Sequence, residues 1–140
     1  MQPKHLHLTS SFLALVGVAD AAFLTFEHYR GDIPPCTVGG CEQVLTSPYA
    51  TLGGVPIALL GLGYYLTILL LSRIEARWAL LARFAIVSSG LVVSGILAYI
   101  QIGILRAICL YCMTSAAITL LLWLTTLTQM QRTQGGTHAN

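Results

Sequence analysis

The chain has 140 residues, of which 56% are hydrophobic and only 9% are charged, and its formal net charge is +2. A soluble globular domain has about 25% charged residues, so this composition is typical of a protein that lies in lipid. The basic residues are too few and too scattered to bind nucleic acid, which requires clustered lysine and arginine. The length predicts one domain.

The sequence contains four apolar stretches, each near the roughly 20 residues that a helix needs to cross a bilayer. We expect these spans at residues 8–28, 55–72, 84–104 and 107–127. Helices are expected because a segment in lipid must satisfy its own backbone hydrogen bonds. Residues 1–128 are therefore predicted to form an all-α membrane domain, a bundle of four transmembrane helices. Residues 129–140 are predicted to form a flexible cytoplasmic tail.

The distribution of basic residues predicts how the bundle is oriented, because lysine and arginine gather on the cytoplasmic side of a membrane. The side with more of them holds Lys4, Arg73, Arg77, Arg83 and Arg132, and the other side holds Arg30 and Arg106. Both termini are therefore expected in the cytoplasm.

An alternative for the first span is a signal peptide that is cleaved near Ala19-Asp20-Ala21. Its apolar run is longer than the usual length of about 7–15 residues. It also contains the acidic Asp20, which is unusual in such a run. We therefore favour a retained membrane span.

The four cysteines form two closely spaced pairs. Cys36 and Cys41, the loop pair, lie between the first and second spans, while Cys109 and Cys112, the helix pair, lie between the third and fourth. The first and third connections of a multi-span protein lie on the same face of the membrane. Both pairs are thus expected together on the outer side, where disulfides persist. Two such pairs can exchange electrons through thiol–disulfide chemistry.

The helix pair has the spacing Cys109-Leu110-Tyr111-Cys112, which places both thiols on one helix face. The start of a helix favours the thiolate, the reactive form of cysteine, through its dipole and its unpaired N–H groups. A single cysteine in a membrane helix usually serves packing. Two cysteines three residues apart, with a second pair on the same face, favour redox chemistry instead.

The loop pair follows Pro34 and Pro35 and encloses two glycines, so an irregular loop is expected there. Taken alone, Cys36 and Cys41 would be read as a static structural disulfide. Four thiols could also bind one structural Zn²⁺. We expect no metal, because such zinc sites usually organise small soluble modules and these thiols face an oxidising compartment.

These features together resemble a known family. The resemblance is carried by Cys36 and Cys41, by Ser47 in the run Val44-Leu45-Thr46-Ser47-Pro48-Tyr49-Ala50-Thr51, by Gly54-Val55-Pro56 and Gly61, and by Cys109-Leu110-Tyr111-Cys112. The chain resembles the vitamin K epoxide reductase family, in particular its bacterial members, over nearly its whole length.

The resemblance implies a four-helix bundle around a quinone near the outer face, with a short outer loop or interfacial helix as a cap over the quinone pocket. It implies that Cys112 contacts the quinone and that Cys109 is its redox partner. By the same correspondence, Cys36 exchanges with Cys109. Cys41 then receives electrons from a thioredoxin-like protein.

Two further residues are candidates for the quinone site. Ser47 matches a family serine near the loop and the quinone pocket, and it could also cap a short interfacial helix. Asp20 is an ionisable group within a span, which is costly in lipid and therefore a functional candidate. Asp20 could contact the quinone or assist proton transfer, or it could pair with a hydroxyl group or with Arg106. We expect Gln101 at the membrane interface and His28 at the solvated rim.

The chain departs from the vertebrate members of the family at two places. Ala116 occupies the position where they have an aromatic residue, and the only asparagine is Asn140, although they hold the quinone carbonyl with an asparagine. A respiratory quinone, ubiquinone or menaquinone, is therefore expected in place of vitamin K epoxide. Some bacterial relatives carry a fused thioredoxin-like domain. This chain ends soon after its last span, so we expect a separate periplasmic partner.

The resulting hypothesis is a thiol:quinone oxidoreductase of the bacterial inner membrane whose active site faces the periplasm. It would reoxidise a thioredoxin-like protein, pass the electrons to a quinone and so support disulfide bond formation. Two alternatives stay open. One is a non-enzymatic membrane protein with structural disulfides, and the other is a quinol-driven disulfide or epoxide reductase.

Overall fold

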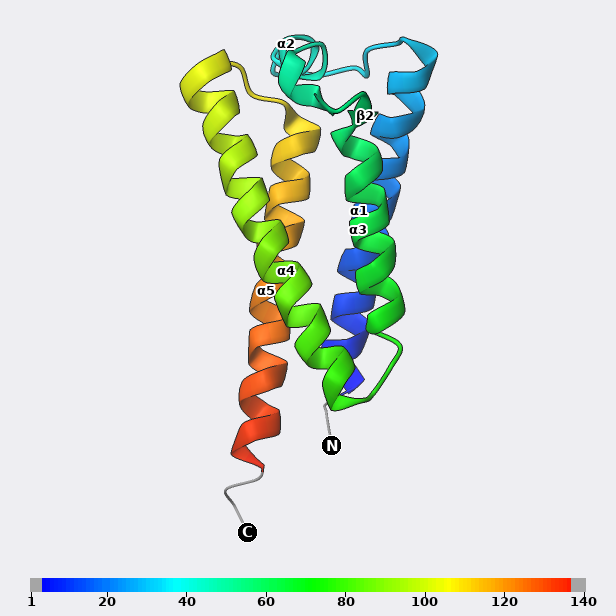
Figure 1. Cartoon of the computed structure of the whole chain (residues 1–140), viewed down its shortest axis with the longest axis vertical. Helices are drawn as coiled ribbons and strands as arrows, with labels where there is room; N and C mark the ends of the chain where they lie inside the picture. Colours follow the sequence, from blue (N-terminus) through cyan, green and yellow to red (C-terminus); the bar gives the residue numbers. More distant parts are fainter. Residues whose placement is uncertain (1–3, 137–140) are drawn as a thin grey trace.

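The computed structural model describes residues 4–136, which form a bundle of four apolar helices (Figure 1). The bundle helices are α1 (Lys4–Arg30), α3 (Ile57–Leu71), α4 (Arg77–Tyr99) and α5 (Leu110–Gly135). By length and composition, α1, the segment Arg77–Leu105 and α5 can each cross a membrane, and α3 is a shorter apolar helix. The prediction of an all-α membrane bundle is confirmed.

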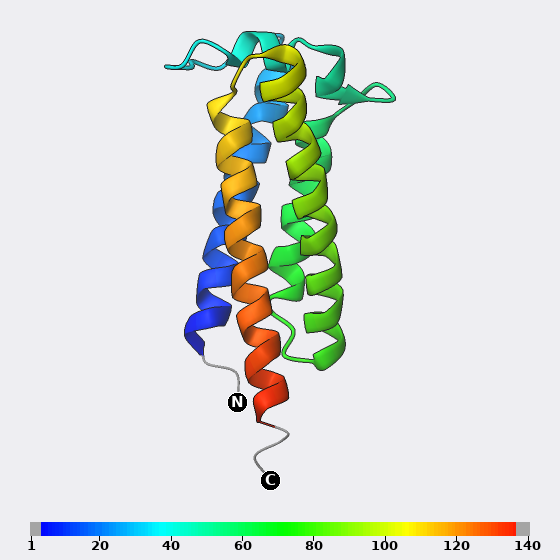
Figure 2. The ribbon, with the colours of Figure 1, turned by 90° about the vertical axis from the view of Figure 1, so that its left-hand side faces the viewer.

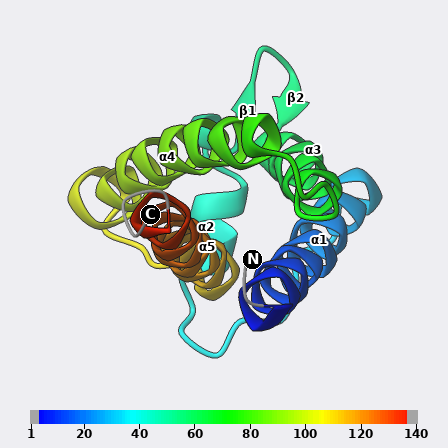
Figure 3. The same ribbon diagram turned by 90° about the horizontal axis from the view of Figure 1, so that it is seen from below.

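The four helices surround a common axis (Figure 3). α1 packs against α3, α3 against α4, α4 against α5, and α5 back against α1. Tyr65 of α3 is 1% exposed and lies at the centre of this arrangement. A β-carbon at Gly17 would overlap the Tyr65 ring, so α1 approaches α3 closely because it has glycine there. The Tyr65 ring therefore fills the core between α1 and α3 and packs directly on the α1 backbone at Gly17.

Short elements lie across the end of the bundle opposite the beginning of α1 and the end of α5 (Figure 1). They are α2 (Cys41–Leu45), the 3₁₀ helix η1 (Pro48–Ala50) and an antiparallel pair of strands, β1 (Thr51–Leu52) and β2 (Val55–Pro56). Gly53 and Gly54 form the tight turn of this hairpin with φ of 59° and 84°, as such turns require. The segment before α2 and the hairpin extend to opposite sides of this end (Figure 2). The short helix expected over one end of the bundle is thus present.

The connection from α4 to α5 has an unusual backbone. α4 continues into the π-helix η2 (Ile100–Leu105), and Arg106 then adopts a left-handed conformation with φ of 51°. The backbone N–H of Ala107 donates to the carbonyl of Gln101 at 3.0 Å. This turn ends the helix and directs the chain back across the bundle end, so that the following residues lie beside α2. Single-turn π-helices often occur at functional sites.

Buried polar side chains join the other end of the bundle. The Arg83 side chain is 2% exposed and donates to Ser72 Oγ at 3.1 Å and to Gln129 Oε1. Gln129 Nε2 in turn donates to Ser10 Oγ of α1 at 3.4 Å. Buried polar groups require such partners. The network therefore ties α1, the end of α3, α4 and α5 together.

This network accounts for two differences from the predicted spans. α4 begins at Arg77 and not at residue 84, because Arg83 is accommodated inside the bundle. α5 continues to Gly135, past the predicted end of the fourth span at residue 127 and through most of the predicted tail. Gln129, the first residue of that tail, is fully buried and hydrogen-bonded. Residues 137–140 lie outside the described residues.

We predict that Gln129→Leu lowers the free energy of unfolding by about 2 kcal/mol, because the charged Arg83 side chain loses a buried hydrogen-bond partner. The measurement is unfolding by sodium dodecyl sulfate in mixed detergent micelles. Gln131→Leu is the matched control, since Gln131 lies two residues further along α5 and is exposed. Equal stability of the two variants would contradict a stabilising role for the network.

Candidate dithiol–disulfide site

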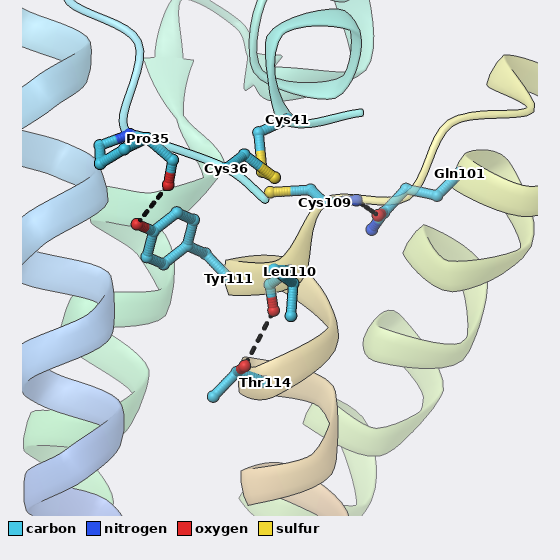
Figure 4. Close-up of a disulfide and its surroundings, with 8 residues drawn as sticks. All are labelled: Pro35, Cys36, Cys41, Gln101, Cys109, Leu110, Tyr111 and Thr114. Atoms are coloured by element: carbon cyan, nitrogen blue, oxygen red, sulfur yellow. Dashed lines mark hydrogen bonds between the residues drawn. A yellow bond between two sulfur atoms is a disulfide. The ribbon is translucent and has the colours of Figure 1, made fainter. Parts of the chain in front are cut away.

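The loop pair forms a disulfide between Cys36 and Cys41, whose Cα atoms are 6.0 Å apart. The loop packs directly on the chain segment that precedes α5. A β-carbon at Gly40 would overlap the backbone of Ile108, so only glycine permits this approach. The Tyr111 hydroxyl also donates to the carbonyl of Pro35 at 2.9 Å (Figure 4). These contacts hold the loop disulfide against the start of α5.

The helix pair lies at that start. Cys109 is the residue before the first turn of α5, Cys112 lies within this turn, and both are free thiols. The Cys109 N–H donates to Gln101 Oε1 at 3.0 Å, within the buried end of the bundle. Gln101, which the sequence analysis expected at the membrane interface, is only 4% exposed. Its amide fixes the position of Cys109 through the backbone and leaves the thiol itself free to react.

The structure brings all four cysteines together. Cys41 and Cys109 are both 0% exposed and share one buried cluster, against which Cys36 and Cys112 pack. The Cys109 side chain points toward the loop disulfide (Figure 4). Thiol–disulfide exchange requires a thiolate that can reach a disulfide sulfur. The arrangement brings the sulfurs of Cys41 and Cys109 close enough for such an exchange.

The electrostatic surroundings of Cys109 favour its thiolate. A hydrogen bond with the Cys112 side chain lowers the pKa of the Cys109 thiol, and the backbone N–H groups of Cys112 and Tyr111 act in the same direction. Burial of Cys109 opposes this shift. Donors at a helix start stabilise a thiolate in the same way in other reactive cysteines. These surroundings stabilise Cys109 as the thiolate, which is the form that a thiol–disulfide exchange releases or consumes.

A cavity of about 440 Å³ lies between the helices next to the helix pair. Its walls come mainly from α3, α4, α5 and the cap, which we define as the short elements α2, η1, β1 and β2. The lining residues include Cys112, Ala116, Ser47, Tyr64, Tyr65 and Gln101. Cys112 is the only one of the four cysteines among the lining residues. The two cysteines of the helix pair thus have different surroundings. Cys109 packs with the loop disulfide, and Cys112 borders the cavity.

The two other predicted ligands differ in position. Ser47 lines the cavity, and its hydroxyl donates to the carbonyl of Val44 at 2.7 Å. Asp20 is not among the residues that line it. Its Oδ2 atom is buried and has no hydrogen-bond partner within residues 4–136, neither a hydroxyl group nor Arg106. The role of Asp20 stays a prediction.

Two residues at the site belong to none of the motifs in the sequence. Gln101 supports Cys109, and His28, expected as a solvated rim residue, borders the cavity. A lone amide inside an apolar span is the signal that could have pointed to Gln101. No sequence pattern marked His28, because its contact with the cavity depends on how the cap covers the end of α1.

Two cysteine pairs that meet at one end of an apolar bundle, with one thiol at a cavity, define a membrane thiol oxidoreductase. Comparison with known protein families agrees with this class. Residues 8–127 match the vitamin K epoxide reductase family, and the chain belongs to that family, as its cysteine and serine motifs predicted.

We predict that the ultraviolet absorbance of the thiolate rises with pH around a midpoint below that of a free thiol when the loop disulfide is intact. Cys112→Ala should move this midpoint upward toward that of a free thiol, about 8.5, because the side-chain hydrogen bond is lost. Cys112→Ser is the matched control, since its hydroxyl can still donate to Cys109. An unchanged midpoint in Cys112→Ala would contradict the assigned cause.

Proposed function

We propose that this protein is a quinone-dependent thiol oxidase of the bacterial inner membrane. It reoxidises a separate periplasmic thioredoxin-like protein, passes the electrons to ubiquinone or menaquinone and thereby supports disulfide bond formation. One observation carries the proposal: Cys109 packs with the loop disulfide while Cys112, three residues further on, lines the cavity. The helix pair can thus connect protein thiols with a membrane-soluble acceptor.

The cavity fits a quinone head group. Its volume of about 440 Å³ is within the range of small-molecule sites, which are mostly apolar and have a few polar groups. Ala116 lines the wall where an aromatic residue would fill space, and Tyr64 and Gln101 contribute polar groups. A quinone bound there would accept two electrons and two protons and leave as the quinol. Cys112 would be the residue in contact with it.

The protein steps are two successive thiol–disulfide exchanges. A thiolate of the reduced partner attacks the loop disulfide, and its second thiol then releases the partner in oxidised form and leaves the loop pair as a dithiol. The loop dithiol next attacks a Cys109–Cys112 disulfide, which re-forms the loop disulfide and reduces the helix pair. Oxidation of the helix pair at the cavity releases two electrons and two protons and restores its disulfide.

Burial favours a different order of the loop cysteines from the one implied by the family resemblance. The resemblance gave the exchange with Cys109 to Cys36 and the attack by the partner to Cys41. Cys41, however, is fully buried in the same cluster as Cys109, whereas Cys36 is partly exposed. We therefore assign the external attack to Cys36 and the internal exchange to Cys41.

The redox state of the structure fits one point in this cycle. The loop pair is oxidised and the helix pair is a dithiol. In the proposed cycle, this state follows the internal exchange and precedes electron transfer to the quinone. The Cys112 thiol is then already at the cavity, so that the last step requires no rearrangement of the loop.

The proposed outward orientation of the site depends on the basic residues of the opposite end. Arg73, Arg77 and Arg132 are exposed there, and such residues favour the cytoplasmic side. Arg83 is buried in the polar network and contributes little to this preference. The cysteine cluster lies at the other end of the bundle (Figure 1), which supports a periplasmic active site.

We predict that Cys112→Ala abolishes quinone reduction with any thiol donor, because the residue at the cavity is lost. Cys36→Ala should abolish turnover with a reduced thioredoxin-like protein but retain quinone reduction with dithiothreitol, a small dithiol that can reduce the helix pair directly. The measurement is the loss of quinone absorbance in detergent-solubilised protein. Full activity of Cys112→Ala would refute the proposal.

The order of the loop cysteines has its own test. A variant with Cys36→Ser and Cys112→Ser retains Cys41 and Cys109, and we expect it to form a Cys41–Cys109 disulfide in high yield. The matched variant with Cys41→Ser and Cys112→Ser retains Cys36 and Cys109 and should form its disulfide in clearly lower yield. Mass spectrometry of the non-reduced protein measures both yields. The opposite ranking would restore the order given by the resemblance.

A further inference from the structure

We infer that Tyr64 is the residue that anchors the bound quinone, by donating a hydrogen bond from its hydroxyl to one quinone carbonyl. This inference depends on the proposed quinone-linked function and specifies how the cavity recognises its ligand. Neither the sequence motifs nor the family resemblance pointed to Tyr64.

The hydroxyl of Tyr64 is an unpaired polar group at the cavity. Tyr64 lines the cavity, and its Oη atom is buried without a hydrogen-bond partner in the described part of the chain. Buried hydroxyls without a partner are rare in native proteins, since burial deprives them of water. An acceptor from outside the chain is therefore expected at this position.

Neighbouring hydroxyls are already engaged. Tyr65 Oη donates to the carbonyl of Ser115 at 2.8 Å, and the hydroxyls of Ser115 and Thr119 lie 2.7 and 3.1 Å from the same oxygen. Tyr65, Ser115 and Thr119 thus form one hydroxyl cluster whose hydrogen bonds lie within the chain. The hydroxyls of Ser47 and Ser89 donate to backbone carbonyls. Tyr64 thus differs from these residues in having a donor to spare.

The position of Tyr64 is fixed by its surroundings. Its ring packs edge-on against Tyr65, with the centroids 5.0 Å apart and the planes at 69°. Its hydroxyl end lies against Gly90 of α4, where a β-carbon would overlap it. Gly90 also lines the cavity. The hydroxyl therefore has a defined position beside Gly90, between α3 and α4, and both Tyr64 and Cys112 border the cavity.

The chemistry of a quinone matches this donor. Quinone carbonyl oxygens accept hydrogen bonds and cannot donate them, whereas a phenolic hydroxyl can donate. Negative charge develops on these oxygens during reduction, and a fixed donor stabilises it. Tyr64 would thus hold one carbonyl in place while the ring is presented to Cys112. In this role Tyr64 is a binding and positioning residue.

The test is infrared spectroscopy of a short-chain ubiquinone, labelled with ¹³C at its carbonyl carbons, bound to the purified full-length protein without reductant. Wild-type protein should show a carbonyl band at lower frequency than in apolar solvent. In Tyr64→Phe, this band should return to the position found in apolar solvent. The dissociation constant should rise about tenfold, as expected for one hydrogen bond.

Tyr99→Phe is the matched control, because it removes a tyrosine hydroxyl from an exposed residue that does not line the cavity, and the carbonyl band should stay as in wild type. Gly90→Ala, which displaces the Tyr64 hydroxyl and leaves Tyr64 intact, should reproduce the effect of Tyr64→Phe. A wild-type band and affinity in Tyr64→Phe would overturn the inference and leave the proposed function intact. Failure of wild-type protein to bind the quinone at all would overturn the proposed function itself.

Discussion

The close approach of two backbones, at Gly40 and Ile108, is the constraint on which the site depends. A side chain at residue 40 would push the loop away from the segment that leads into α5. With glycine there, Cys41 on one side and Cys109 on the other enter the same buried cluster. The two pairs are far apart in the sequence, and their meeting is determined by this contact and by the bond from Tyr111 to the carbonyl of Pro35. The thiol chemistry itself requires nothing more than this proximity.

Separate sets of buried hydrogen bonds support the two ends of the bundle. At the end near the chain termini, Arg83 and Gln129 link the helices through a network that contains no thiol. At the cysteine end, Gln101 supports the backbone of Cys109, and Tyr65 binds the carbonyl of Ser115, one turn beyond Cys112. The residues that stabilise the bundle through side-chain hydrogen bonds therefore differ from the cysteines that carry the redox chemistry. None of the side-chain hydrogen bonds that link the helices in this network involves a cysteine.

The sequence predicted much of this arrangement, because the features involved are local or follow from topology. Spans of apolar residues predict the bundle, and the order of the connections predicts that both cysteine pairs share one end. A lone amide in an apolar span marks Gln101 as a candidate, but its contact with the Cys109 backbone could not be predicted. That contact depends on the π-helix and on the left-handed backbone of Arg106, which hydrophobic periodicity does not reveal. The helical continuation past residue 127 was missed for a related reason. From the sequence alone, a polar residue such as Gln129 indicates the start of a tail, because its hydrogen-bond partner Arg83 is distant in the sequence.

The spacing of the helix pair explains how one turn of helix can serve two reactions in different surroundings. Residues i and i+3 are neighbours on a helix surface, yet the unwound segment before α5 places Cys109 just outside the helix and Cys112 inside it. Cys109 therefore faces the loop disulfide among buried side chains, while Cys112 faces the cavity between the helices. A disulfide between the two needs no movement of either helix, because both thiols belong to one turn. In the proposed cycle, electrons from a protein thiol would become available at the cavity through the cleavage and re-formation of this single local bond.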